Sequence, residues 1–234
     1  MGLNHNEGKR SFTAPAGTAK FPHLNTPDTK YDEDGVYKVD IVMDSGSSEA
    51  QELIALIDNY VDEAVEEKKG ELKPAAAKKL ESHTPYFMEE DDEGEQTGRV
   101  VFRFKANYQF KDQKTGNIIY RTITMFDAKG GKPLKNPPFV RGGSVLKIAS
   151  KISNPWYNPQ TKSAGVTLYI QAVQILELGQ GGGGGDASGF GFGEEEDFDG
   201  VGESESEAAG FTDDDDDADP VQDDAPPNEG EGDF

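Results

Sequence analysis

Apolar and polar positions alternate in residues 36–43. Every second side chain from Tyr37 to Met43 is apolar, whereas Lys38 and Asp40 lie between them. A strand with one buried face has this period of two. The pattern therefore predicts a first strand at Val36–Met43.

The next segment, Ser48–Lys69, has apolar residues at intervals of three and four, as on one face of a helix. Ser48 and Gln51 have the spacing of a capping box, and Gly70 follows as a C-cap. We predict an amphipathic helix whose apolar stripe packs on the core. The stripe consists of Leu53, Ile54, Leu56, Ile57, Tyr60, Val61, Ala64 and Val65.

The later part of the chain has the pattern of β structure up to residue 178. The acidic run Glu89–Glu93 before it predicts a solvated loop. Turn residues then separate segments rich in β-branched and aromatic residues. With the first strand these segments predict an all-β fold, a five-stranded antiparallel OB-type barrel with one helix. Strand number alone is also compatible with other small barrels. The later strands are predicted at Val100–Phe110, Ile118–Phe126, Val145–Ile152 and Val166–Leu178.

The two ends of the chain differ from this central segment, residues 36–179. Residues 1–35 are rich in Pro, Gly, Thr and Asn, which predicts an extended arm or irregular lead-in. Residues 180–193 are Gly-rich and are predicted to form a linker. Residues 194–234 combine low hydrophobicity with high negative charge, which predicts a disordered acidic tail.

Charge is unevenly distributed along the chain, whose formal net charge is −22. Residues 181–234 hold 20 Asp or Glu and no Lys or Arg. Residues 97–176 hold 13 Lys or Arg against two acidic residues, a local net charge of +11. A cationic segment and a polyanionic tail in one chain indicate binding of a polyanion that the tail imitates.

Composition narrows the classes of protein further. The chain has no cysteine, which excludes disulfides and thiolate zinc sites and favours the cytoplasm. No apolar run approaches the roughly 20 residues of a membrane span, and the N-terminus lacks the apolar core of a signal peptide. The three histidines are scattered among loop-like residues, and no catalytic motif is present. We expect a protein that is not an enzyme, has no cofactor and binds no membrane.

Two of the predicted strands carry basic residues on the face opposite their apolar residues. Arg103 and Lys105 alternate with phenylalanines, and Lys147 and Lys151 alternate with aliphatic residues. A face that served only solubility would mix acidic with basic residues. The four residues therefore favour a groove that follows a phosphate backbone over a merely solvated surface.

Aromatic residues near these strands are candidates for stacking on bases. Trp156 and Tyr157 lie side by side in a proline-bounded segment just after Lys151. Stacking on such rings is worth roughly 1 to 3 kcal/mol per base. The alternative is that Trp156 packs into one end of the barrel as a structural residue, while Tyr157 remains partly exposed to solvent. Tyr108 is a further candidate if a bulge turns it outward, because strict alternation places it with the core.

Several short sequences together resemble the single-stranded DNA-binding proteins of T7-like podophages. They are Gly35-Val36-Tyr37-Lys38-Val39-Asp40, Phe102-Arg103-Phe104-Lys105, the stretch from Gly142 to Lys147, Pro155-Trp156-Tyr157 and the acidic tail ending in Gly232-Asp233-Phe234. The resemblance implies an OB-fold homodimer that coats single strands in replication, recombination and repair and promotes annealing, in the host cytoplasm if phage-encoded.

The same resemblance assigns roles to individual residues. Lys9 and Arg10 match basic residues near the family's N-terminus, whereas Asp34 stands where the family has a basic residue. In the family the tail occupies the DNA groove when DNA is absent and contacts the phage DNA polymerase and helicase-primase, with an important terminal Phe. The partner-binding residues here would be Asp213, Asp214, Asp215, Asp216, Asp217, Asp233 and Phe234.

The hypothesis from sequence is a non-catalytic, sequence-tolerant single-stranded DNA-binding protein. The alternative is an acidic scaffold or DNA-mimic protein that binds basic protein partners and no DNA.

Overall fold

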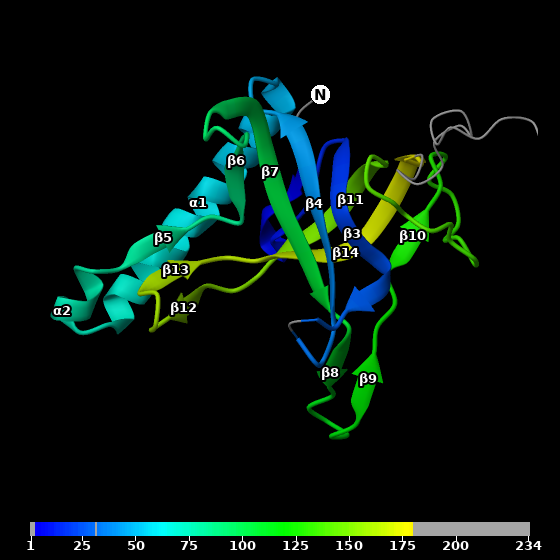
Figure 1. Ribbon diagram of the computed structural model, residues 1–234. Coiled ribbons are helices and arrows are strands. Elements are labelled where there is room, and N and C mark those ends of the chain that lie inside the picture. Colours follow the sequence, from blue (N-terminus) through cyan, green and yellow to red (C-terminus); the bar gives the residue numbers. More distant parts are fainter. Residues whose placement is uncertain (1–2, 31, 180–234) are drawn as a thin grey trace, which may run out of the picture. The chain divides into compact units, whose positions relative to one another are not determined.

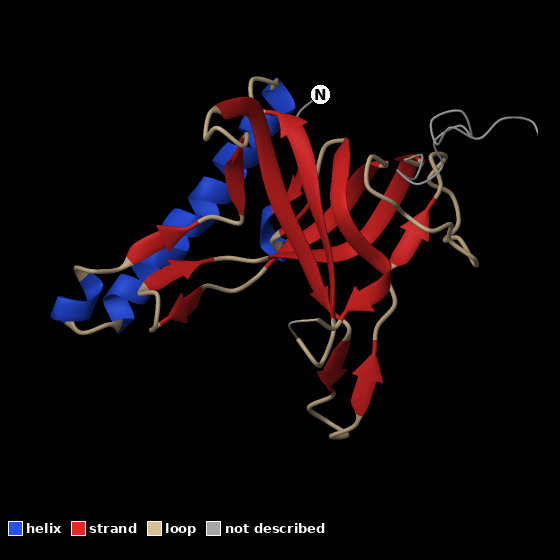
Figure 2. Ribbon diagram, in the orientation of Figure 1, coloured by secondary structure: helices blue, strands red, loops and turns tan. Residues whose placement is uncertain are grey.

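Five strands close into a barrel in the computed structural model, which describes residues 3–30 and 32–179 (Figure 1, Figure 2). Around the barrel each strand pairs with the next, and the last pairs again with the first. All pairs are antiparallel except β7 with β14, which is parallel. In this order the strands are β3 (Gly17–Asp28), β4 (Val36–Asp44), β7 (Gln96–Asn107), β14 (Leu168–Glu177) and β11 (Val145–Ile152). The predicted all-β, OB-like barrel is confirmed.

The barrel interior is filled by alternate side chains of these strands. Val39 on β4, Phe104 on β7 and Leu168 on β14 are at most 1% exposed. Since side chains alternate along a strand, their neighbours Lys38 and Lys105 face outward. The alternation read from the sequence thus places the basic residues of β4 and β7 on the outer surface.

The N-terminal segment, predicted as an extended arm or irregular lead-in, includes regular elements and one strand of the barrel. It contains β1 (Asn4–Asn6), the 3₁₀ helix η1 (Glu7–Lys9), β2 (Ser11–Thr13) and the barrel strand β3. Prolines and two register shifts in β3 break its period of two, although its side chains Ala19 and Leu24 are buried. The sequence pattern therefore concealed this strand.

The predicted strand Ile118–Phe126 forms two short strands instead. β9 (Ile118–Tyr120) pairs with β8 (Gln109–Lys111) in a hairpin, whereas β10 (Thr124–Phe126) pairs with β14 outside the barrel. The hairpin carries exposed Phe110, Ile118, Ile119 and Tyr120 and lies at the bottom of Figure 1. The place of this segment in the barrel is taken by β3.

The predicted helix is confirmed as α1 (Ser48–Glu71), but its ends differ. Its N-cap is Ser47, whose Oγ accepts a hydrogen bond from the backbone N–H of Ala50 at 3.2 Å. The helix continues through Gly70 and ends at Glu71, and its C-cap Leu72 has an extended backbone. The short helix α2 (Pro74–Ala77) follows. The predicted apolar stripe is mostly buried.

A three-stranded sheet lies along α1 (Figure 1). It consists of β12 (Trp156–Asn158), β13 (Ser163–Gly165) and β5 (Glu81–His83) in this order. The strands come from two segments that are far apart in sequence, residues 81–83 and 156–165. Packing on α1 therefore holds Trp156 beside the barrel.

The acidic run Glu89–Glu93, predicted as a solvated loop, forms an exposed turn at residues 91–93 but begins in a strand. Glu89 belongs to β6 (Tyr86–Glu90), which pairs with β7, and only 8% of Glu89 is exposed. Its carboxylate accepts hydrogen bonds from Lys20 on β3 and from the hydroxyl of Thr97. These partners compensate for the burial of the charge. The predicted linker and acidic tail, residues 180–234, lie outside the described residues.

Candidate nucleic-acid interface

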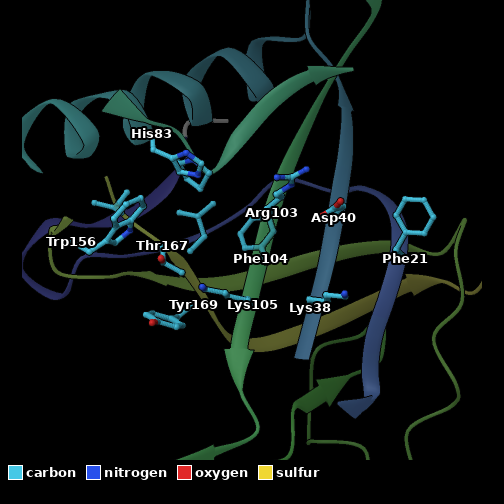
Figure 3. Close-up of a pocket in the computed structure, with 13 residues that line it drawn as sticks. Phe21, Lys38, Asp40, His83, Arg103, Phe104, Lys105, Trp156, Thr167 and Tyr169 are labelled. Carbon is cyan, nitrogen blue, oxygen red and sulfur yellow. The ribbon is translucent and has the colours of Figure 1, made fainter. Parts of the chain in front are cut away.

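A groove with a volume of about 720 Å³ lies on the outer surface of β4, β7 and β14 (Figure 3). Lys38, Arg103 and Lys105 supply its positive charge. Figure 3 shows these residues between Trp156 on one side and Phe21 on the other. We call this the cationic groove. Its polar and aromatic lining residues are Phe21, Lys38, Asp40, His83, Arg103, Phe104, Lys105, Trp156, Thr167 and Tyr169.

The basic residues of the groove come together through the strand register. Lys38 pairs with Lys105, and Asp40 pairs with Arg103, across β4 and β7. Lys105 pairs in turn with Tyr169 on β14. Because neighbouring strands lie about 4.8 Å apart, these outward side chains form one continuous surface. The surface presents three cations to a ligand and one carboxylate.

Asp40 is the carboxylate in this cationic surface. Burial raises the pKa of Asp40, against the nearby positive charges of Arg103, Lys38 and Lys20. The raised pKa means that the environment penalises the ionised form despite the surrounding cations. An approaching anion would penalise that form further.

Trp156 is held at the groove wall by the three-stranded sheet. Its register partner is Gly165, and its ring centroid lies 5.5 Å from that of His83. A Cβ atom at position 165 would lie 2.3 Å from the His83 carbonyl oxygen and 3.3 Å from Trp156 Cζ2. Only glycine allows this approach. The buried indole N–H has no hydrogen-bond partner among the described residues, so packing alone fixes the ring.

A second groove, of about 680 Å³, lies between the N-terminal strands and β11. Lys9, Arg10 and Lys151 line it. Lys151 is the register partner of Tyr169, which lines the cationic groove. The second groove therefore adjoins the first across β14, and Lys151 lies two strand spacings, about 10 Å, from Lys105.

A family model of the single-stranded DNA-binding protein of bacteriophage T7 matches residues 16–178. The chain belongs to this family. The match covers all five barrel strands, from β3 to β14. The residues that line the cationic groove lie within this match, whereas most residues that line the second groove, at positions 4–13, precede it.

Solved structures that are similar to this chain include two phage proteins. The crystal structure of a single-stranded DNA-binding protein encoded by bacteriophage T7 is 27% identical, with a TM-score of 0.62, over 76% of this chain and 97% of that chain. A single-stranded DNA-binding protein from bacteriophage Enc34 in complex with single-stranded DNA is 13% identical, with a TM-score of 0.48, over 77% of this chain and 98% of that chain. A comparison with curated proteins finds no match.

In this member of the T7 family, the basic residues predicted from sequence are divided between several places. Arg103 and Lys105 line the cationic groove, and Lys9 and Lys151 line the second. Lys147 faces outward on β11 but is not among the described residues that line either groove. The predicted basic set is therefore not one cluster.

Arg10 makes contacts that orient its guanidinium toward the protein. Its Nη2 donates a hydrogen bond to the Ser153 carbonyl at 3.0 Å, and its Cζ lies 4.5 Å from the centroid of the Tyr60 ring on α1. These contacts attach the N-terminal segment to the helix. They place Arg10 at the edge of the second groove with part of its hydrogen-bonding capacity already used.

The two other aromatic candidates lie outside the cationic groove. Tyr157 follows Trp156 on β12 and therefore points to the opposite face of the strand. Tyr108 packs against Tyr37 with ring centroids 5.9 Å apart and against Tyr120 at 5.2 Å. Of the three rings predicted to stack on bases, Trp156 is the one that lines this groove.

Sequence reasoning did not assign most of the groove residues to the site, among them Phe21, Lys38, His83 and Tyr169. The alternation in β4 marked Lys38 as outward and was the one available signal. Phe21 lies in a strand that the pattern concealed, and His83 reaches the groove only through the packing of β5 on β13.

The described residues contain no group of three or more His, Cys, Asp or Glu that would hold a metal ion. None of the described helices has both the length and the apolar character needed to cross a membrane.

Proposed function

We propose that the cationic groove binds the backbone and bases of single-stranded DNA without sequence preference. The observation that carries this proposal is the arrangement of Lys38, Arg103 and Lys105 in register beside the ring of Trp156. Cations that track a phosphate backbone, together with aromatic faces on which any base stacks, are the elements of sequence-tolerant single-strand binding. Membership in the T7 family supports DNA as the ligand.

The second groove extends the proposed path of the strand. Lys151 is the register partner of Tyr169 on β14. Single-stranded DNA that crosses β14 therefore reaches Lys9 and Lys151 after leaving Lys105. One nucleotide spans several ångströms of backbone, and the two lysines on β7 and β11 lie about 10 Å apart. The path from one groove to the next is therefore only a few nucleotides long.

We further propose that the chain coats single strands in phage replication, recombination and repair, promotes annealing, and acts as a homodimer in the host cytoplasm. Its acidic tail would compete with DNA for the cationic groove. Displaced by DNA, the tail would recruit the phage DNA polymerase and helicase-primase through Asp213–Asp217, Asp233 and Phe234. The opposite charges of the groove and the tail support this exchange.

The proposal is tested by removing charge from the groove and, as a control, from another surface. Binding of an unstructured labelled oligonucleotide is measured by fluorescence anisotropy for Arg103→Ala/Lys105→Ala and for Lys132→Ala/Lys135→Ala. The control pair is exposed, lies in the loop after β10 and removes the same charge.

Counterion release predicts that two lost phosphate contacts cost about 25-fold in affinity at 0.1 M salt. The control should retain nearly all affinity. Equal losses in both variants would show that net charge, and not this groove, determines binding. Absence of binding by the unmodified protein would favour the acidic scaffold instead.

A further inference from the structure

Phe21 is the most exposed of the large hydrophobic side chains among the described residues, at 73%. It lines the cationic groove on the side opposite Trp156 (Figure 3). A single exposed apolar residue is common on protein surfaces and does not by itself indicate a function. Its backbone conformation is what distinguishes Phe21.

The backbone of Phe21 is strained. Its φ is +48°, in the left-handed region that residues other than Gly, Asn and Asp rarely adopt. Phe21 also precedes Pro22, and a residue before proline normally takes an extended conformation. Such strain persists only where the surrounding structure imposes it, and it concentrates at functional sites.

A β-bulge produces this conformation and turns the ring outward. The register of β3 with β4 is continuous up to Lys20 and shifts before His23, so that Phe21 lies in the irregular part. Ala19, two residues earlier, is buried in the barrel. Regular alternation would place Phe21 on the same inward face. The bulge moves an apolar ring from the core side to the groove, and bulges are known to re-aim side chains in this way.

The surroundings of the ring indicate what it contacts. Lys38 and Arg103 lie between Phe21 and Trp156 in the groove. Phosphates on these cations would bring the attached bases toward the ring faces at the two sides. A ring face is also the feature that every base recognises equally well.

We propose that Phe21 is a base-stacking residue and that the strained bulge at Phe21 and Pro22 presents it to single-stranded DNA. This inference rests on the proposed binding of DNA in the cationic groove. Phe21 and Trp156 then contact bases at opposite sides of a phosphate-binding floor. A purely structural Phe21 would not need a conformation that glycine adopts more easily.

The strain provides a test that separates binding from folding. Phe21→Gly removes the ring and relieves the left-handed conformation, so we expect an unchanged or higher melting temperature. We expect its affinity for an unstructured oligonucleotide to fall about 5- to 150-fold, the range of one lost stacking contact. Phe21→Tyr should bind within about two-fold of the unmodified protein, because the ring face remains.

Phe139→Ala is the matched control, since Phe139 is also exposed, at 60%, and is not among the residues lining the cationic groove. Its affinity should stay unchanged. If Phe21→Gly binds as tightly as the unmodified protein while Arg103→Ala/Lys105→Ala binds weakly, the inference on Phe21 is wrong and the groove proposal stands. If the charge variant also binds normally, the groove proposal itself fails.

A spectroscopic measurement tests the contact even if the glycine variant folds poorly. In Phe21→Trp/Trp156→Phe, the sole tryptophan lies at position 21. Saturation with the oligonucleotide should quench its fluorescence through stacking. Unchanged fluorescence at saturation would overturn the proposed contact.

Discussion

Lys38 on β4 and Lys105 on β7 are direct register partners on the outer surface of the barrel. Like charges in opposite positions of a sheet destabilise it. Lys38 is partly compensated by an ion pair with Asp28 on β3. An anion bound in the groove that the two lysines share would offset the repulsion between them.

Lys105→Ala should separate stability from DNA binding. It removes one member of a like-charge pair, so the melting temperature should stay constant or rise slightly. Loss of one phosphate contact should lower the affinity for single-stranded DNA about five-fold at 0.1 M salt. Thermal unfolding and anisotropy titrations measure the two effects.

Lys147→Ala is the control for that prediction, because Lys147 also faces outward from a barrel strand but is not among the lining residues of either groove. Its affinity should change less than about two-fold. An equal loss in both variants would indicate that DNA runs along β11 and not through the cationic groove.

Asp40→Asn should tighten DNA binding, because it removes the negative charge that opposes phosphate in the groove. The pKa of Asp40 is raised, so lowering the pH protonates it before ordinary aspartates. The DNA affinity of the unmodified protein should therefore increase as the pH falls through this pKa. The Asp40→Asn variant should not show the increase that protonation of Asp40 causes. Titrations between about pH 4 and 7 test this; identical pH profiles would rule out a role for Asp40.

Trp156 and Tyr157 should differ in their contribution to binding although they are adjacent in sequence. Trp156→Ala removes a ring that lines the groove and should weaken binding by about 5- to 150-fold. Tyr157→Ala removes a ring on the other face of β12 and should have little effect. Stronger weakening by Tyr157→Ala would place the bases on the opposite side of the three-stranded sheet.

Removal of the acidic tail should tighten DNA binding. Truncation after Gly185 deletes all 20 acidic residues of the tail and therefore the proposed competitor for the groove. Phe234→Ala should leave DNA affinity almost unchanged and weaken binding to the replication partners. Surface plasmon resonance measures the affinity for DNA and the binding to the polymerase. Truncation that leaves DNA affinity constant would contradict the competition between the tail and DNA for the groove.

Glu89 should make stability depend on acid pH. Its hydrogen bond with Lys20, followed by that with Thr97, lowers the pKa of Glu89 below the ordinary 4.5. The stabilisation is complete above 4.5 and is lost as the pH falls through the lowered value. Glu89→Gln should be less stable at neutral pH and lose less stability on acidification. Parallel acid-unfolding curves for the two proteins would disprove this contribution.

The sequence predicted those parts of the fold that have a regular period. Four barrel strands and the helix α1 each have one continuous buried face, and each lies close to its predicted range. The four strands are β4, β7, β11 and β14. β3 was missed because bulges and prolines interrupt its alternation. The same irregularity concealed Phe21.

The candidate site was predictable in part. Alternation within one strand marked Arg103 and Lys105 on β7 as outward, and the proline-bounded segment after Lys151 marked Trp156. Which strands adjoin, however, depends on barrel closure, and neither the pairing of Lys105 with Tyr169 nor the approach of His83 to Trp156 has a local sequence signal. The separation of Lys147 from the groove is likewise a consequence of the register.

The central claim is that lysine and arginine in the cationic groove bind the phosphates of single-stranded DNA. Its most direct test is the salt dependence of affinity for the unmodified protein and for Arg103→Ala/Lys105→Ala. Log affinity should fall linearly with log salt concentration, with a slope of about −0.7 per phosphate contacted, and the variant's slope should be smaller by about 1.4. Affinity that does not change with salt, or equal slopes for the two proteins, would contradict the account.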